Sequence, residues 1–332
     1  MNLVGDKAKL KLFIKNLAIN FKLIAPVSRD GILTISQINV NDFEEIDWSG
    51  VLPEKSWKSY ILPATEKIIE HSEEKIKEFL TNKIEKRALI AMNVIDLKAL
   101  SLFDLVFSND IYYQNNRRQL LIIGYGANWP NEYKKLKPFS YNYEEDILEH
   151  VPFDVFIAQI RGGIYKFYSG SKKGQVILES SIIKNFDHVE FAGPIPEEGP
   201  DKRMMLLMEK VEKSAGKNFW KELGKKCIAC GKCSIACPTC YCFDLIDKSD
   251  PNCQSRERRW SNCFYNDFSK VAGGHKELDT VGKKIFFWYV HKFVRVPFSY
   301  KIPGCVSCGR CTKVCPVGID IAKNIATIMK FK

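Results

Sequence analysis

Cysteines are the residues of this chain best suited to chemistry, and all twelve lie between residues 227 and 315. The first 226 residues contain none. The opening stretch, MNLVGDKAKLKLFIKNL, lacks the apolar core of a secretion signal, so we expect a cytoplasmic protein without a disulfide scaffold. The cysteines are therefore interpreted as metal ligands.

Eight of the cysteines belong to an internal repeat. CIACGKCSIACP at 227–238 and CVSCGRCTKVCP at 305–316 share the pattern C-x-x-C-G-[KR]-C-x-x-x-C-P. Such a loop gives three thiolates to one 4Fe-4S cluster, and in two-cluster ferredoxins the cysteine before proline ligates the other cluster. The pattern predicts that one cluster is bound by Cys227, Cys230, Cys233 and Cys315. It predicts that the second cluster is bound by Cys305, Cys308, Cys311 and Cys237.

Zinc is the alternative metal, because C-x-x-C pairs also suit tetrahedral zinc sites. The third and fourth cysteine of each run, and the proline that follows, favour clusters. Four cysteines remain outside the repeat: Cys240, Cys242, Cys253 and Cys263. They are either packed thiols, which are often buried, or the ligands of a possible third iron-sulfur cluster.

The charge is unevenly distributed along the chain. Residues 1–216 hold 29 Lys and Arg against 30 Asp and Glu, whereas residues 217–332 hold 21 against 9. Two oxidised clusters with their thiolates, each with a formal charge of about −2, would offset part of this excess. We expect the remainder to form a docking face for an acidic partner. No nucleic-acid-binding module is recognisable, so nucleic acid is not expected as a partner.

Hydrophobic patterning predicts an α+β protein with two domains. We expect a mixed α/β domain over 1–216, which would bind a partner, and a mostly α-helical two-cluster ferredoxin-like domain over 217–332. Apolar runs predict strands at 89–94, 119–124, 155–160 and 175–178. Helical spacing predicts an amphipathic helix over 65–89 and further helices over 201–214 and 283–293. The most apolar run spans only six residues, 285–290, so no direct membrane insertion is expected.

Several motifs resemble those of a known family of 4Fe-4S dicluster proteins. CxxCGKCxxxCPTCYC at 227–242, RxRRWxxC at 256–263, AGGH at 272–275 and HKF at 291–293 are similar to motifs of the family that contains anaerobic sulfite reductase subunits and the beta subunits of sulfhydrogenases, which are NiFe hydrogenases. Less specific similarities to the family are KLIAPV at 22–27, LPEKSWKSYILPATE at 52–66 and DLKALSLFDLVFSND at 96–110. The chain departs from the family pattern at Asn93, Val94 and Ile95, where relatives carry P-C-D, and in a cysteine-free stretch after residue 123.

The resemblance implies an electron relay. Such proteins pass electrons between two partners, a flavin-binding, nicotinamide-linked subunit on one side and a catalytic hydrogenase or sulfite-reductase-type subunit on the other. The sequence has no Walker lysine, dinucleotide loop or paired nucleophile and base, so we assign no catalytic residues. The alternatives are a stand-alone iron-sulfur reductase of a small substrate and a cluster-binding regulator. Arg256, Arg258 and Arg259 could tune the potential of a cluster or bind an acidic partner, but a solvated run of charges is the commoner explanation. His275 could be a ligand or a proton donor, but a lone histidine more often has a structural role.

Overall fold

The structure is a computed structural model that describes residues 5–72, 75–78, 85–127, 147–160, 163–195, 201–250 and 253–331. Its contacts divide the chain into two compact units. The first comprises Met1–Ile61, Lys83–Glu197 and the short segment Val306–Cys308. The second comprises Leu62–Asn82, Glu198–Cys305 and Gly309–Lys332, so it includes a piece of the N-terminal half of the chain. The division into domains after residue 216 stays a prediction.

The first unit is built on a seven-stranded mixed sheet in the order β2-β1-β5-β6-β7-β8-β9. Its central strands β1, β5, β6 and β7 are parallel, and β2 and β8 pair antiparallel with their neighbours. The expected strands at 89–94, 119–124 and 155–160 are confirmed, whereas 175–178 lies inside helix α5. The strands are β1 Lys22–Arg29, β2 Ile32–Ile38, β5 Arg87–Asn93, β6 Leu120–Gly126, β7 Val155–Ile160, β8 Ile164–Ser169 and β9 Asp187–His188.

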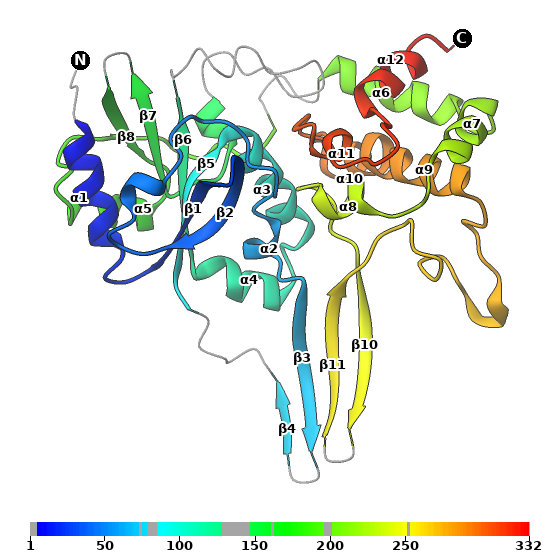
Figure 1. Ribbon diagram of the computed structural model, residues 1–332, viewed down its shortest axis with the longest axis horizontal. Coiled ribbons are helices and arrows are strands. Elements are labelled where there is room, and N and C mark those ends of the chain that lie inside the picture. Colours follow the sequence, from blue (N-terminus) through cyan, green and yellow to red (C-terminus); the bar gives the residue numbers. More distant parts are fainter. Residues whose placement is uncertain are drawn as a thin grey trace. The chain divides into compact units, whose positions relative to one another are not determined.

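Helices pack on both faces of this sheet, which explains why its central strands are apolar throughout. On one face, α1 (Lys7–Leu17) buries Phe13 against Phe167 of β8 with ring centroids 5.6 Å apart. On the other face, a side chain at Gly124 of β6 would meet Leu97 of α3 (Val94–Val106) and Phe156 of β7. The other helices of this unit are α2 Lys58–Ile61, α4 Ile111–Arg118 and α5 Lys172–Glu179 (Figure 1).

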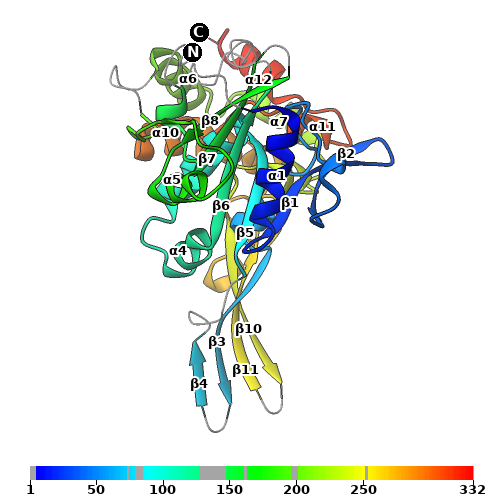
Figure 2. The ribbon, with the colours of Figure 1, turned by 90° about the vertical axis from the view of Figure 1, so that its left-hand side faces the viewer.

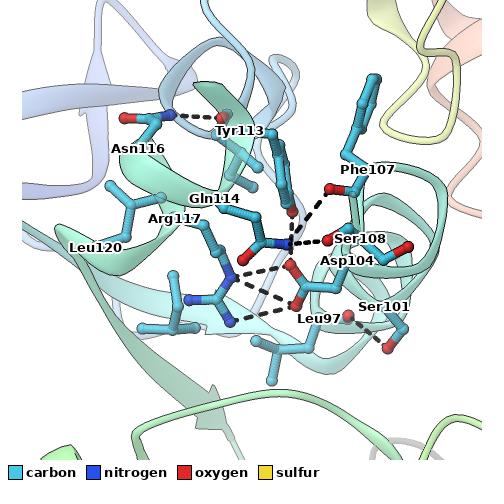
Figure 3. Close-up of polar contacts among 12 residues, drawn as sticks. Leu97, Ser101, Asp104, Phe107, Ser108, Tyr113, Gln114, Asn116, Arg117 and Leu120 are labelled. Carbon is cyan, nitrogen blue, oxygen red and sulfur yellow. Dashed lines mark hydrogen bonds and ion pairs between the residues drawn. The ribbon is translucent and has the colours of Figure 1, made fainter. Parts of the chain in front are cut away.

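Polar contacts hold α3 and α4 together (Figure 3). Asp104 of α3 accepts a hydrogen bond from the Tyr113 hydroxyl at 2.6 Å and forms an ion pair with Arg117 at 3.1 Å. Asp110 caps α4 by accepting the Tyr113 backbone N–H at 2.8 Å. Two acidic residues of the motif at 96–110, Asp104 and Asp110, therefore stabilise this part of the scaffold.

The second unit contains a four-stranded antiparallel sheet in the order β10-β11-β3-β4. Both views show its strands side by side (Figures 1 and 2). They are β3 Thr65–Ser72, β4 Lys75–Glu78, β10 Phe243–Asp250 and β11 Cys253–Trp260. The helix expected over 65–89 is therefore wrong where the structure describes it. The partner strand β11 supplies the reason, because its buried Arg258 stands opposite Glu66 and forms an ion pair with it.

Helices make up the rest of the second unit. The expected helix at 201–214 is confirmed as α6, with Asp201 as its N-terminal cap. The expected helix at 283–293 is confirmed as α9, which continues into a π-helical turn. These helices are α6 Lys202–Lys213, α7 Asn218–Lys226, α8 Lys232–Ala236, α9 Val281–Val290, the π-helical turn His291–Arg295, α10 Val296–Tyr300, α11 Arg310–Lys313 and α12 Ile321–Ile328.

Candidate iron-sulfur centres

The two cysteine runs fold into loops with the same backbone conformation. Ala229 and Ser307 occupy equivalent positions and have φ values of 53° and 55°. The glycines two residues later, Gly231 and Gly309, have φ values of 72° and 74°. A short helix, α8 or α11, starts directly after each glycine, and the two helices pack against each other. The repeat in sequence is thus a repeat in structure.

The first loop surrounds a cavity that lies wholly within the second unit. Cys227, Cys230 and Cys233 line it, as expected for three ligands from one loop. Cys315, the last cysteine of the other run, lines the same cavity. Its other walls are mostly apolar and include Phe264, Ile285, Trp288, Tyr289, Cys311, Pro316, Val317, Ile319 and Ile321. The structure therefore brings together the four residues that the sequence assigns to one cluster, and Cys311, which the sequence assigns to the other cluster, lines the same cavity.

The chemistry of this cavity fits a sulfur-rich anionic group. The Cys227 sulfur accepts the Ala229 N–H at 3.4 Å, and the Cys315 sulfur accepts the Ile319 N–H at 3.2 Å. The buried indole N–H of Trp288 has no hydrogen-bond partner among the described residues, so an acceptor in the cavity would satisfy it. Burial, followed by the charge of Cys227, raises the pKa of Cys233 to about 12.

The fourth cysteine of the first run, Cys237, lies apart from that cavity lining and beside a buried lysine. Its sulfur is 3.1 Å from the Lys292 ammonium and 3.1 Å from the Thr239 hydroxyl. Lys292 and Thr239 also donate to the Gly304 carbonyl, at 3.2 and 2.9 Å, and Gly304 directly precedes Cys305. Cys237 is thereby held next to the start of the second loop.

The electrostatics around Cys237 favour its thiolate. A hydrogen bond with Cys240 and the charge of Lys292 hold the pKa of Cys237 well below its usual value despite complete burial. Burial opposes the charge of Lys292, but the thiolates of Cys237, Cys240 and Cys305 raise the pKa of Lys292 well above its usual value. In the second loop, Cys305 and Cys311 belong to the second unit. Cys308 lies between them in the sequence, and its segment Val306–Cys308 groups with the first unit.

Three of the four remaining cysteines lie at one end of the β10–β11 hairpin. Cys240 and Cys242 precede β10, and the Cys242 carbonyl accepts the Ser261 N–H at 2.9 Å, two residues before Cys263. Burial, followed by the charges of Cys242 and Cys233, raises the pKa of Cys263 to about 12. The register pairs Phe243 with Trp260 at this end and Asp250 with Cys253 at the other. Seven strand residues, or roughly 23 Å, therefore separate Cys253 from the other three along the hairpin.

The weaker sequence candidates lie outside the cavity lining described above. Arg258 is buried against Glu66, Arg256 pairs with the exposed Asp247, and Arg259 stands opposite Asp244 and Thr65 across the sheet. His275 is exposed, with Glu277 at 3.4 Å. In the described parts of the chain, no three metal-ligating side chains converge on the position of a single ion.

Sequence reasoning missed two buried residues next to the loops. Lys292 contacts Cys237, but it stands in the HKF landmark with no spacing that links it to a cysteine. Asn262 is fully buried, and its amide would lie 2.5 Å from any side chain carbon added at Gly231. The only signal in the sequence is that Asn262 precedes one of the twelve cysteines.

Comparison with known proteins agrees with this geometry. Residues 226–319 match the family model described as a 4Fe-4S dicluster domain. This region is a 4Fe-4S dicluster domain. Sulfhydrogenase 2 subunit beta of Pyrococcus furiosus is 26% identical over 330 residues, which cover 91% of this chain and 90% of that protein. No solved structure matches the chain.

The match implies that this cysteine-rich region binds 4Fe-4S clusters, which makes the chain an iron-sulfur protein. Bound clusters would supply reversible one-electron chemistry, and the cysteine loops would hold them. Among the described helices, none has the length and hydropathy needed to cross a membrane.

Proposed function

We propose that this chain is the electron-relay component of a multi-subunit oxidoreductase in the cytoplasm. It would pass electrons between two partners, a flavin-binding, nicotinamide-linked subunit on one side and a catalytic subunit of the hydrogenase or sulfite reductase type on the other. Two 4Fe-4S clusters would carry the electrons, one on Cys227, Cys230, Cys233 and Cys315 and the other on Cys305, Cys308, Cys311 and Cys237.

One observation carries the proposal: the last cysteine of each run lies with the opposite loop. Cys315 lines the cavity of the first loop, and Cys237 is tied through Lys292 and Thr239 to the residue before Cys305. This arrangement supports crossed ligation, which places two clusters side by side as a two-step path for electrons. Because a regulator needs only one cluster to respond, the pair favours electron transfer.

The comparison supports a place in a complex. The Pyrococcus furiosus protein carries the name of a sulfhydrogenase subunit, and the similarity covers nine-tenths of both chains. The surplus of lysine and arginine in residues 217–332 would provide a docking face for an acidic partner. The alternative, a stand-alone reductase of a small substrate, is less favoured because the sequence contains no acid–base or cofactor motif.

The purified chain alone tests the relay. Isolated without oxygen, it should be reduced by a low-potential reductant such as dithionite, yet should not turn over sulfite, sulfur or protons. Isolation of the untagged native complex should yield a flavoprotein and a catalytic subunit together with this chain. Turnover by the purified chain alone would instead establish the stand-alone enzyme.

We also propose that Cys240, Cys242 and Cys263 bind a third metal centre, because the structure gathers them at one end of a hairpin. Replacing any of these three by Ser should lower the iron content by more than one atom per chain. The electron paramagnetic resonance signals of the two repeat clusters should remain. Cys253→Ser is the matched control, since its backbone lies at the other end of the hairpin. Unchanged iron content in all three single variants would show that these thiols only pack.

A further inference from the structure

Lys292 is a buried cation without a carboxylate partner in the described part of the chain. It lies in the π-helical turn between α9 and α10, and it is 3% exposed. A buried ammonium is costly unless hydrogen bonds and an opposite charge compensate it. A group that can carry a negative charge lies in contact with it, the sulfur of Cys237 at 3.1 Å.

All three donors of this ammonium are used at one point of the fold. They reach the Cys237 sulfur, the Thr239 hydroxyl at 2.9 Å and the Gly304 carbonyl at 3.2 Å. The face of the Trp288 ring lies 5.5 Å away. The lysine thus connects the end of the first cysteine run with the start of the second.

The backbone is shaped to hold Lys292 there. A side chain carbon on Gly304 would lie 2.4 Å from the Lys292 carbonyl oxygen, so only glycine allows these two segments to touch. The corresponding cysteine of the other run has a different partner. The sulfur of Cys315, which corresponds to Cys237 in the repeat, accepts the backbone N–H of Ile319 instead of an ammonium.

We propose that Lys292 is a positioning residue that raises the reduction potential of the cluster ligated by Cys237, and so makes that cluster the preferred site of the electron in the relay. Reduction adds one negative charge to a cluster, and a neighbouring buried ammonium stabilises the reduced form more than the oxidised form. Its hydrogen bond to the ligand sulfur acts in the same direction. The proposal rests on the ligation by Cys237 in the proposed function.

Lys292→Met in the full chain, purified with its clusters, is the test. Redox titration followed by electron paramagnetic resonance should show one cluster with a lower midpoint potential. We expect at least a tenfold shift of its reduction equilibrium, which is about 59 mV for one electron. The other cluster should keep its potential, and the iron content should not change. Lys292→Arg keeps the charge, so its midpoint potential should stay close to that of the unmodified protein.

Lys284→Met is the matched control. Lys284 lies on α9 and is buried like Lys292, but its ammonium donates to the Phe264 carbonyl at 2.9 Å and to the Asn266 side chain at 3.0 Å. Its loss should leave both potentials unchanged. Equal shifts in the two variants would show that any buried lysine has this effect, and the specific role of Lys292 would be refuted.

Two further variants separate the possible failures. Should Lys292→Met fail to bind clusters, Lys292→Gln keeps a donor without the charge and should show the same downward shift. Unchanged potentials in fully loaded Lys292→Met and Lys292→Gln variants, or loss of the cluster in both, would overturn the proposal. Cys237→Ser is measured in parallel, because full iron and unchanged spectra in that variant would refute the ligand assignment itself.

Discussion

Gly231 and Gly309 offer a matched pair of substitutions in the two cysteine loops. Both residues have left-handed backbone conformations, with φ values of 72° and 74°. An L-residue in this conformation costs about 1–2 kcal/mol, so alanine at either position should destabilise the protein by that amount. The surroundings of the two glycines differ, and this difference predicts unequal effects.

Only Gly231 is sterically confined. Its added methyl carbon would lie 2.5 Å from the side chain nitrogen of Asn262, whereas nothing lies within 4 Å at Gly309. Asn262 is fully buried and accepts the Phe264 N–H at 2.9 Å, so it cannot swing away. Overpacking of this kind costs about 1–3 kcal/mol. Gly231→Ala should therefore cost about 2–5 kcal/mol in total and Gly309→Ala about 1–2 kcal/mol.

Anaerobic denaturant unfolding, followed by loss of cluster absorbance, compares the two variants. The extra cost of about 1–3 kcal/mol corresponds to roughly a 5- to 150-fold larger unfolding constant for Gly231→Ala. Adding Asn262→Ala should remove the clash, so the double variant should be more stable than the sum of the single effects predicts. Equal effects of the two glycine substitutions, or a larger effect at Gly309, would refute the steric argument.

Two further substitutions test the scaffold. Arg258→Met leaves the partly buried Glu66 without its partner and should lower the free energy of unfolding, measured with denaturant, by about 3 kcal/mol. Arg256→Met removes an exposed ion pair and should have little effect on the same measurement. A small loss at Arg258 would mean that β3 and β11 do not depend on this pair. Gly174→Ala would bring a methyl group within 1.7 Å of the Asp154 carbonyl oxygen, so circular dichroism should show a first unit that unfolds at a much lower temperature or fails to fold.

The sequence predicted those features that depend on local spacing. The cysteine runs and the strands β5, β6 and β7 could be recognised because their residue types recur at fixed short intervals. Segment 65–72 was misread because adjacent Ile68 and Ile69, flanked by charges, also fit a helical face. Its true partner is β11, nearly two hundred residues later, and no local pattern reveals this pairing.

The same limit applies to the site. Crossed ligation is a prediction from the repeat, based on the ligation pattern of two-cluster ferredoxins, and it stays a prediction. The contact between Lys292 and Cys237 could not be predicted, because it depends on how α9 and its π-helical turn pack against the loops. The sequence offers Cys240, Cys242, Cys253 and Cys263 together as a possible third site. The register of the hairpin separates Cys253 from the other three.

The metal content of the anaerobically purified chain tests the central claim most directly. We expect about eight iron atoms per chain if the two repeat clusters form, and about twelve if the third centre is also filled. Cys230→Ser and Cys308→Ser should each remove or convert one cluster. About two zinc atoms per chain with little iron would contradict the account, because the cysteine loops would then be zinc sites.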